Sequence, residues 1–584
     1  MKKLGVKVTS MTNYKIEKFP FTQESVSNWG SADPVGIDWP VVYTLSSDKQ
    51  IYIGETLNAT SRLLQHLKTE NKQDLERVQI ILNSRFNKSA CLDLESQLIK
   101  LFAADGTHRV LNANSGITDS NYFERDEYRE SFNELYEMLV RDGLLSRSIP
   151  EIVNSNLFKF SPFKALTTEQ AVVVSAITEQ IITEVRSSSK AQMIVQGDPG
   201  TGKTIVAIYL VKLLKDIALM NGDELAEQES IFSELFAEES AAIIKGLRIG
   251  LVVPQQALRK TLQTVFTQTP GLDKSMVLTP FDVADSAEDF DLLIVDEAHR
   301  LGQRANQSSA AQNKKYSELN IKLFGSDDPA ITQLDWIEKK SKLQLLLLDT
   351  AQAVRPADLP LETTNQLIKN ASSMGLLFRL VSQMRVTGGA EYLEFIRALF
   401  TNEPRPREVF NGYDLRFYDD ASKMRQDILQ LDAEHGLARL LAGFAWPWLS
   451  KRNPSAIDIE LDGMKLQWNQ TDTDWINSNT SVNEVGGIHT IQGYDLNYAG
   501  VIIGKDIGYD PVDQKIIFNR ENYFDVKGRE NNSARGIVYT DEDVLHWVLN
   551  IYRVLLTRGI RGTFVYVCDP ELRKLLAARF IQID

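Results

Sequence analysis

Short apolar runs alternate with helical patterns from about residue 165 to the end of the chain. Each run is apolar at nearly every position, and such strands are typical of parallel sheets that helices cover on both faces. A first set of runs lies at 193–197, 249–254, 291–297 and 343–349, and a second set lies at 415–420, 499–506 and 563–569. The pattern predicts an α/β protein with two successive parallel-sheet lobes.

The first 142 residues show a different pattern. Two β-type runs, VVYTL at 41–45 and IYIGE at 51–55, are separated by a turn of hairpin length. Helical patterns follow, the last at 127–140. Polar residues and proline then predict a linker. We therefore expect a small α+β domain at 1–142, a linker at 143–164, a first lobe at 165–370 and a second lobe at 371–584. An acidic segment at 216–245 is expected to be a helical insertion in the first lobe, with its charges in solvent.

Composition and charge narrow the class of protein. The chain has 584 residues and a formal net charge of -14, which argues against a broad basic surface that coats nucleic acid. A local groove for one strand stays compatible with this charge. Cys91 and Cys568 lie far apart in sequence, so no disulfide framework is expected. Because no apolar run is long enough to span a bilayer, we expect a soluble, cytoplasmic protein with no membrane partner. A protein partner or a homo-oligomer is left open.

A glycine-rich loop between a predicted strand and an apolar helix contains the clearest chemistry. Its pattern is G-x-x-x-x-G-K-[ST], in which backbone N–H groups turn toward phosphate oxygens. The lysine supplies a charge at the β- and γ-phosphates, and the hydroxyl is a ligand for Mg²⁺. The loop consists of Gly197, Asp198, Pro199, Gly200, Thr201, Gly202, Lys203 and Thr204. The sequence therefore predicts a site for ATP and Mg²⁺.

Two carboxylates end the predicted strand at 291–297. Asp296 is positioned to hold Mg²⁺, and Glu297 to orient the attacking water, as phosphoryl transfer to water requires. A strand end with two solvated carboxylates is the alternative interpretation. Together with the phosphate loop, the pair predicts an ATPase.

The order of these and further motifs resembles superfamily 1 helicases, and most closely the Schlafen group 3-like DNA/RNA helicase domain. The further motifs are LTTEQ at 166–170, LVVPQQALRKTL at 251–262, DTAQ at 349–352, QMR at 383–385, HTIQGYD at 489–495 and YRVLLTR at 552–558. The resemblance implies adenine recognition by Gln170, γ-phosphate sensing by Gln352 and a ribose contact by Asp495. It also implies nucleic-acid contacts by Pro254, His489, Thr490 and Gln492.

The same resemblance makes Arg385 and Arg558 arginine fingers. A planar guanidinium stabilises the charge that develops on the γ-phosphate. If both fingers come from the second lobe, hydrolysis requires the lobes to close, which would couple ATP turnover to stepping along a strand.

Two departures limit the expected activity. Asp495 stands where glutamate is common in the superfamily. The short segment between the motifs at 383–385 and 489–495 favours a translocase or limited unwinder over a processive helicase. Its tryptophans, Trp446, Trp448, Trp468 and Trp475, are expected to pack in a core more often than to stack on bases.

The N-terminal domain resembles the GIY-YIG endonuclease family. Tyr43 and the triplet at 52–54 match its paired strands, although Val41 replaces the first glycine. Arg62 and His66 lie at i and i+4 on one helix face. The resemblance implies hydrolysis of a phosphodiester, with Tyr43 or Tyr52 as proton acceptor, His66 as helper and Arg62 as phosphate clamp.

Glu95 lies within an apolar helical stripe, where a carboxylate is costly unless it is paired or bound to metal. In the family the matching glutamate holds one divalent cation. Asn112 is the expected site asparagine, with Asn114 as the alternative. An active nuclease is the favoured hypothesis, and a degenerate domain that only binds is the alternative.

The leading hypothesis for the whole chain is an ATP-driven translocase or helicase coupled to a metal-dependent endonuclease. We expect it to act on DNA rather than RNA, in phage defence, restriction or repair, with the resemblance favouring defence. The alternative is an ATPase switch, stimulated by nucleic acid, whose N-terminal domain is a binding module that does not cut.

Overall fold

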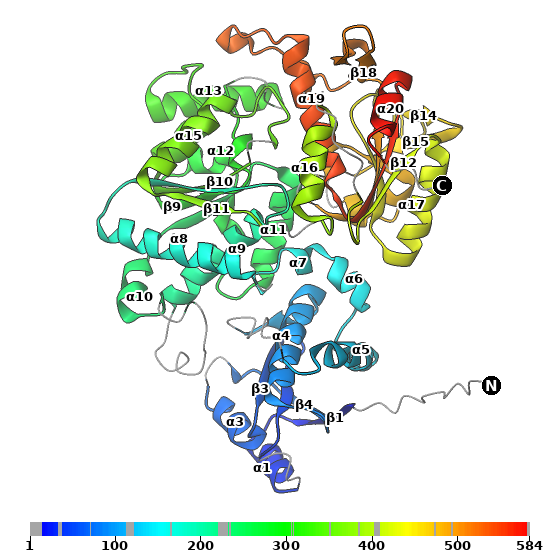
Figure 1. Cartoon of the computed structure of the whole chain (residues 1–584). Coiled ribbons are helices and arrows are strands. Elements are labelled where there is room, and N and C mark those ends of the chain that lie inside the picture. Colours follow the sequence, from blue (N-terminus) through cyan, green and yellow to red (C-terminus); the bar gives the residue numbers. More distant parts are fainter. Residues whose placement is uncertain are drawn as a thin grey trace, which may run out of the picture. The chain divides into compact units, whose positions relative to one another are not determined.

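The computed structural model describes residues 14–32, 38–69, 72–112, 122–163, 166–219, 232, 235–304, 307, 309–349, 352–382, 386–401, 409–471, 475–491 and 494–580. The chain forms two compact units (Figure 1). Unit 1 consists of Met1–Leu166 and Thr264–Asp273, and unit 2 consists of Thr167–Gln263 and Lys274–Asp584.

Unit 1 is built on a five-stranded sheet in the order β1-β4-β2-β3-β5. The strands are β1 (Tyr14–Pro20), β2 (Val41–Ser46), β3 (Gln50–Thr56), β4 (Arg77–Asn83) and β5 (Arg109–Val110). The predicted hairpin is present as β2 and β3, which pair antiparallel. The helices are α1 (Gln23–Ala32), α3 (Ala59–His66), α4 (Lys88–Asp105), α5 (Arg125–Arg141), α6 (Ile149–Asn154) and α7 (Asn156–Lys159).

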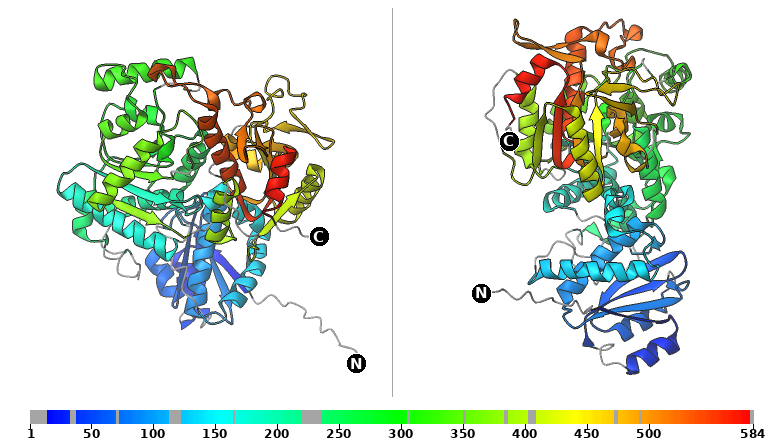
Figure 2. Two further views of the ribbon diagram at one scale, coloured as in Figure 1. Left: turned by 45° about the horizontal axis from the view of Figure 1, so that its top comes forward. Right: turned by 90° about the vertical axis from the view of Figure 1, so that its right-hand side faces the viewer.

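Helices cover both faces of this sheet (Figure 2). Alternate residues of a strand point to opposite faces. Tyr43 of β2 therefore packs on the face of α1 and α3, and its neighbour Val42 packs on the face of α4 and α5. The predicted helices around Arg62, around Glu95 and at 127–140 are present as α3, α4 and α5.

The segment predicted as a linker, 143–164, is folded where the structure describes it. Leu145, Ile152 and Phe163 belong to the core that α4 and α5 share. Pro150 lies in the first turn of α6, where its missing N–H costs nothing. The buried carboxylate of Asp105 accepts hydrogen bonds from the backbone of 146 and 147. The proline is compatible with a helix at its first turn, and the apolar residues pack in the core. The segment is therefore part of unit 1 and not a linker.

The first sheet of unit 2 has six parallel strands in the order β11-β6-β10-β9-β7-β8. They are β6 (Ala191–Gly197), β7 (Ile249–Val252), β8 (Val277–Leu278), β9 (Phe290–Val295), β10 (Ser341–Leu348) and β11 (Leu377–Leu380). Its helices are α8 (Thr168–Arg186), α9 (Lys203–Ala218), α10 (Glu238–Ile244), the start of α11 (Gln256–Gln268), α12 (Pro280–Asp285), α13 (Ala310–Phe324), α14 (Gln333–Lys340) and α15 (Leu361–Met374). In Figure 1, α8 and α9 lie below the strands, and α12 and α15 lie above them.

Two expectations for this lobe change. β11 pairs with β6, so the first sheet extends past the expected boundary at 370 to Leu380. The expected insertion at 216–245 overlaps the end of α9 and contains α10, while most of its acidic centre lies outside the described residues.

The second sheet has seven strands in the order β12-β20-β17-β13-β16-β15-β14. They are β12 (Asp414–Tyr418), β13 (Ala438–Ala442), β14 (Ile459–Leu461), β15 (Met464–Trp468), β16 (Glu484–Gly486), β17 (Leu496–Ile503) and β20 (Gly559–Val567). A separate hairpin consists of β18 (Ile507–Asp510) and β19 (Lys515–Phe518). The helices are α16 (Gly389–Leu399), α17 (Ala421–His435), α18 (Ile488–Ile491), α19 (Asp541–Leu556) and α20 (Pro570–Ala577).

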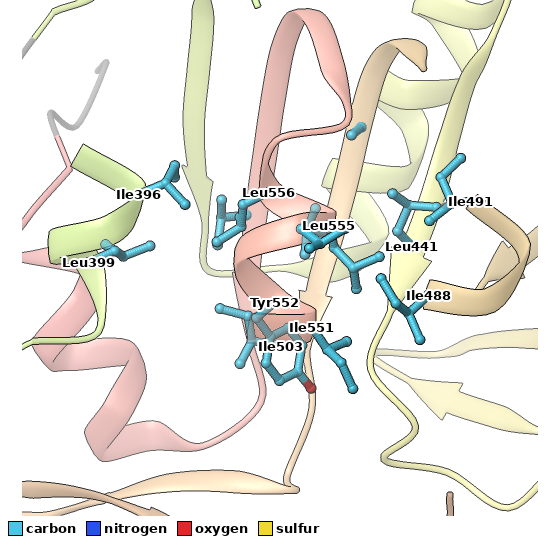
Figure 3. Packing of buried hydrophobic residues seen from close by; sticks show 14 of the residues in the cluster. Ile396, Leu399, Leu441, Ile488, Ile491, Ile503, Ile551, Tyr552, Leu555 and Leu556 are labelled. Carbon is cyan, nitrogen blue, oxygen red and sulfur yellow. The ribbon is translucent and has the colours of Figure 1, made fainter. Parts of the chain in front are cut away.

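The strands of this sheet send alternate residues into two cores. Val565 of β20 packs with α16 and α19, whereas Phe564 packs with α17. Figure 3 shows the first core, where Ile396, Leu555 and Ile488 come from three different helices. Burial of both faces explains why these strands are apolar at consecutive positions.

Both cysteines are buried and free. Within the described part of the chain, every helix is too short or too polar to cross a bilayer.

Candidate functional site

The phosphate loop joins β6 to α9, as the sequence predicts. Gly200 and Gly202 have φ of 89° and 80°, a left-handed conformation that glycine adopts without strain. A Cβ on Gly197 would lie 2.6 Å from Oγ1 of Thr201, so the tight turn also requires glycine there. α9 begins at Lys203, which places its N-terminal N–H groups at the loop, where an anion is favoured.

Lys203 and Gln352 meet at one carboxylate. Nζ of Lys203 donates to the carbonyl of Asp198 (3.0 Å) and lies 3.5 Å from Oδ2 of Asp349. Nε2 of Gln352 donates to the same Oδ2 at 2.6 Å. All of these residues follow β6 or β10, which are neighbours in the sheet. The structure therefore connects the loop lysine with the predicted γ-phosphate sensor.

Thr204 and Asp296 are also brought together. The hydroxyl of Thr204 donates to Oδ2 of Asp296 at 2.8 Å. Burial raises the pKa of Asp296, and the neighbouring charge of Glu297 raises it further. These two oxygens are of the kind that Mg²⁺ takes from proteins, beside phosphate oxygens and waters.

Glu297 has an unusual backbone. Its φ of 50° is left-handed, a conformation that is sparsely populated outside glycine and clusters at functional sites. Oε2 lies 3.1 Å from Nε2 of His299. Burial alone would raise the pKa of Glu297, but the hydrogen bond and charge of His299 outweigh it and lower that pKa. The carboxylate is therefore ionised, as an orienter of water must be.

Gln170 lies beside the phosphate loop. Its side chain is 1% exposed, and Nε2 donates to the carbonyl of Thr201 at 2.9 Å. The adjacent Glu169 accepts hydrogen bonds from the backbone N–H groups of Val381 and Ser382. α8 thus holds both the phosphate loop and the chain that leads to 383–385.

The predicted arginine fingers differ in what the structure shows. Arg385 lies outside the described residues. Arg558 is 1% exposed, and its guanidinium donates to the carbonyls of Val554 and Tyr494. These contacts direct Arg558 into the second lobe, so the finger role stays a prediction.

The predicted nucleic-acid contacts are also only partly described. Pro254 follows β7, and its carbonyl accepts from Arg259 at 3.2 Å. Thr490 is 7% exposed and donates to Asn469, so its hydroxyl is already engaged. Gln492 lies outside the described residues. Asp495, the predicted ribose contact, is half-buried directly before β17.

His489 makes the contact between lobes that the motifs did not predict. Its Nε2 lies 2.6 Å from Nη2 of Arg355, which follows Gln352 in the same loop of the first lobe. Further hydrogen bonds between these lobes include those of Asn550 with Ala353, Tyr539 with Pro356, Arg535 with Gln303 and Thr261 with Tyr494. Arg355 lies in a loop, so no hydrophobic periodicity could have identified it from the sequence. The signal that the sequence does offer is its position just after the DTAQ motif.

The tryptophans of the second lobe are mainly core residues, as expected. Trp468 and Trp475 are fully buried. Trp446 and Trp448 are partly buried and pack against the core that contains Trp468.

In unit 1, Tyr43 and His66 form a buried pair. Oη of Tyr43 lies 2.7 Å from Nε2 of His66. Gly54 is opposite Tyr43 in the hairpin, and a Cβ there would lie 2.4 Å from that Oη. The glycine therefore makes room for the phenol ring. Burial raises the pKa of Tyr43 well above its usual range, while the charge of Arg62 opposes this.

Glu95 lies beside a second carboxylate, that of Glu55. Burial raises the pKa of Glu95 to about 8, and the charge of Glu55 adds to this. Glu55 pairs with Lys88 through Oε1, and no donor among the described residues reaches its buried Oε2. A protonated or cation-bound Glu95 fits these surroundings, although the described residues hold no cluster of three or more His, Cys, Asp or Glu side chains suited to a metal.

Asn112 is engaged with the backbone. Its Nδ2 donates to the carbonyl of Ile53 at 2.7 Å, and its Oδ1 accepts from the N–H of Ile53 at 3.0 Å. These bonds hold β3 next to the segment after β5. Asn114, the alternative, lies outside the described residues. Arg62 donates to Gln65 within α3.

Comparison with known proteins places the chain in a family. Residues 190–569 match the family described as Schlafen group 3, DNA/RNA helicase domain, which is more than half of the chain. The chain belongs to this family. It is a superfamily 1 helicase-like protein of the nucleic-acid translocase class, as the motif order indicates.

Individual relatives are more distant. The uncharacterized protein YPL245W of Saccharomyces cerevisiae is 27% identical over 405 residues, which cover 66% of this chain and 84% of that protein. The helicase nonstructural protein 10 of an arterivirus is 13% identical, with a TM-score of 0.27; the match covers 68% of this chain and 64% of that one. The Pif1 helicase from Bacteroides is 10% identical, with a TM-score of 0.25, over 72% of this chain and 95% of that one.

Proposed function

We propose that this chain moves along or remodels DNA by hydrolysing ATP with Mg²⁺, and that its N-terminal domain cuts nucleic acid. The observation that carries the motor is the assembly at the ends of three neighbouring strands. Lys203 and Gln352 share the carboxylate of Asp349, and Thr204 binds Asp296. Phosphate loop, acid pair and γ-phosphate sensor thereby lie at the ends of neighbouring strands, where one set of hydrogen bonds joins the loop to the sensor and another joins it to the acid pair.

In this proposal each residue has one task. Backbone N–H groups of the loop and Lys203 hold the phosphates, and Gln170 reads the adenine. Thr204 and Asp296 would hold Mg²⁺, which when bound neutralises charge on the phosphates. Glu297 orients the attacking water because its carboxylate is ionised and buried.

The second lobe completes the site. Arg385 and Arg558 would stabilise the charge that develops on the γ-phosphate once the lobes close. Arg558 would have to leave its present carbonyl partners to do so. The strand would lie against Pro254, His489 and Gln492. We propose a translocase or limited unwinder acting in phage defence, restriction or repair inside the cytoplasm.

The test of the motor is ATP turnover by the full chain with and without single strands. Single-stranded DNA should raise the rate more than RNA of the same sequence, and Lys203→Ala should abolish turnover. Turnover that single strands of either kind leave unchanged would contradict the translocase. Stronger stimulation by RNA would contradict only the choice of DNA.

A specific observation favours the nuclease as a second function. The buried pair of Tyr43 and His66 lies near Arg62. The charge of Arg62 opposes the rise in the pKa of Tyr43 that burial causes, and it adds to the fall in the pKa of His66. Glu95 is close enough for its charge to act on the same phenol. A proton acceptor, a cation for the phosphate and a carboxylate for a metal are the groups that phosphodiester hydrolysis needs. We propose that Glu95 holds a single divalent cation, with Glu55 beside it.

The structure allows a sharp test of cutting. Wild-type protein, Glu95→Gln and Glu137→Gln are incubated with Mg²⁺ and single-stranded, duplex and branched DNA. Glu137 is an exposed glutamate in the same unit and serves as the matched control. Cutting lost only in Glu95→Gln supports the nuclease. If all three proteins bind the DNA and none cuts it, the result supports the alternative, an ATPase switch whose N-terminal domain is a binding module.

A further inference from the structure

A lysine that the motifs did not predict is buried in the nuclease-like site. Lys72 is 7% exposed, and its Nζ lies 2.9 Å from Nδ1 of His66. The same Nζ lies 3.6 Å from the centre of the Tyr52 ring. Buried lysines are rare unless they are paired, because the ammonium loses its hydration. A polar stretch such as 68–74 normally keeps its lysines in solvent, as it does for Lys68.

The hydrogen bonds around His66 fix where its proton lies. An ammonium group donates and cannot accept. Nδ1 of His66 must therefore accept from Lys72. A neutral imidazole carries one N–H, so that proton lies on Nε2. Nε2 is 2.7 Å from Oη of Tyr43, so His66 donates to the phenol oxygen.

Electrostatics keeps His66 in this neutral form. Burial comes first, and the charges of Lys72 and Arg62 follow; together they lower the pKa of His66 to about 3. Among the described residues, the titratable or charged side chains found with a direct contact or a charge effect on this ring are Tyr43, Tyr52, Lys72 and Arg62. A histidine that stays neutral and has no free acceptor nitrogen cannot be the base.

We propose that Lys72 is a positioning residue, which holds His66 as a donor so that Tyr43, and not Tyr52, exchanges the proton of the attacking water. The inference rests on the nuclease function proposed above. Nε2 of His66 lies against the hydroxyl of Tyr43, whereas Tyr52 contacts His66 only with its ring in the contacts described, with ring centroids 5.0 Å apart. The face of the Tyr52 ring carries the ammonium of Lys72.

The phenolate of Tyr43 takes a proton from water while the water oxygen bonds to phosphorus. The bond from phosphorus to the leaving sugar oxygen breaks, and that oxygen takes a proton from solvent. The Tyr43 phenol then loses its proton to solvent. Burial opposes the phenolate. The charge and the hydrogen bond of Arg62 favour it, and so does the N–H that His66 directs at Oη in this proposal.

The first test needs no catalytic activity. The full chain is labelled with ring-¹⁵N histidine, His66→Gln identifies the signal of His66, and nitrogen shifts report the tautomer. We expect the proton on Nε2 from pH 8 down to pH 5. Lys72→Met should mix the tautomers and raise the pKa of His66, whereas Lys68→Met should change neither. A proton on Nδ1 in the wild-type chain would overturn the proposal, whether or not Lys72→Met folds.

The second test measures cutting over a range of pH. Tyr43→Phe should lower kcat at least about a hundredfold, and Tyr52→Phe less than about tenfold. Lys72→Met should lower kcat about ten- to a hundredfold at neutral pH with little change in KM, and should shift the alkaline rise of the profile upward. A loss of kcat in Tyr52→Phe but not in Tyr43→Phe would overturn the assignment of Tyr43 as the proton acceptor. If the wild-type chain cuts nothing, the nuclease itself fails, and the tautomer still shows whether Lys72 orients His66.

Discussion

Arg355 of the first lobe donates to His489 of the second at 2.6 Å, although 134 residues separate them in sequence. Because arginine has no acceptor, Nε2 of His489 is the acceptor at this distance; the carboxylate of Asp525 lies farther from the same nitrogen, at 3.4 Å. Burial, and after it the charge of Arg355, lowers the pKa of His489 to about 4, in agreement with this assignment. Arg355 shares a loop with Gln352, so one short segment reaches both the phosphate side of the site and the motif predicted to contact the strand.

This relationship predicts that Arg355→Met separates ATP turnover from strand binding. Lys203, Asp296 and Glu297 are untouched, so turnover without nucleic acid should stay within about threefold of wild type. Stimulation by single strands should fall at least about tenfold, because loss of a charge-assisted hydrogen bond is worth roughly 1.5–3 kcal/mol. Both rates come from a steady-state ATPase assay with and without single-stranded DNA.

Arg397→Met is the control for that prediction. Arg397 also joins the two lobes, through an ion pair with Asp198, but its side chain is 48% exposed. Exposed pairs contribute little, so stimulation should be nearly unchanged. Equal losses in both variants would mean that any contact between the lobes suffices, and that Arg355 has no special part.

The ATP site could be predicted from the sequence because its residues sit at strand ends. A strand that is buried on both faces is a run of apolar residues, and polar residues begin where the strand ends. Lys203, Asp296 and Gln352 each follow such a run, so the sequence marks them as candidates. Parallel strands place their carboxyl ends at the same edge of the sheet, which brings these residues together. The contact of Arg355 with His489 could not be predicted in this way. It joins two loops, and loops carry no periodicity.

The other differences between the sequence-based expectations and the structure also have physical causes. The supposed linker contains Pro150, which normally marks a break but is compatible with the first turn of a helix. β11 is only four residues long and half-buried, and β8 has only two residues, so both lack the apolar run that marks the other four strands described in the first sheet. Lys72 resembles its exposed neighbours in sequence, and only the fold reveals that it is buried.

Glu297→Gln should stop hydrolysis while ATP still binds. The amide keeps the size of the side chain but loses the ionised oxygen that orients water, so kcat should fall about 10²- to 10⁴-fold. Affinity for ATP should stay within about threefold, since Lys203 and the loop N–H groups remain. Single-turnover kinetics with a fluorescent ATP analogue separates the two quantities. A large loss of affinity with kcat retained would show that Glu297 serves binding.

Gly54→Ala should destabilise unit 1 through the ring of Tyr43. The new Cβ would lie 2.4 Å from Oη and 2.5 Å from Cζ of that ring. Tyr43 is fully buried and cannot move aside freely. Such overpacking costs about 1–3 kcal/mol. Urea denaturation should show this loss of unfolding free energy. The double variant Gly54→Ala/Tyr43→Ala should lose less unfolding free energy than the sum of the losses in the two single variants. Strict additivity would mean that the clash is relieved elsewhere.

His66 makes the stability of unit 1 depend on pH in a defined direction. Its pKa is about 3 in the fold and about 6.5 in an unfolded chain. Between these values the unfolded state binds one more proton, so the free energy of unfolding falls as pH drops below about 6.5. From pH 7.5 to 5.5 the loss from this group is about 1.4 kcal/mol.

Pulse proteolysis in urea, read by mass spectrometry of peptides from β2 and α3, measures that loss at both pH values. His66→Gln should be less stable than wild type at pH 7.5. Because glutamine cannot take up the proton, the unfolding free energy of this variant should fall about 1.4 kcal/mol less than that of wild type between pH 7.5 and pH 5.5. The side chain is 3% exposed, so solvent screening does not reduce the effect. If wild type and His66→Gln lose the same stability between the two pH values, the pKa of His66 is the same in the folded and the unfolded chain, and the fold does not hold its imidazole neutral.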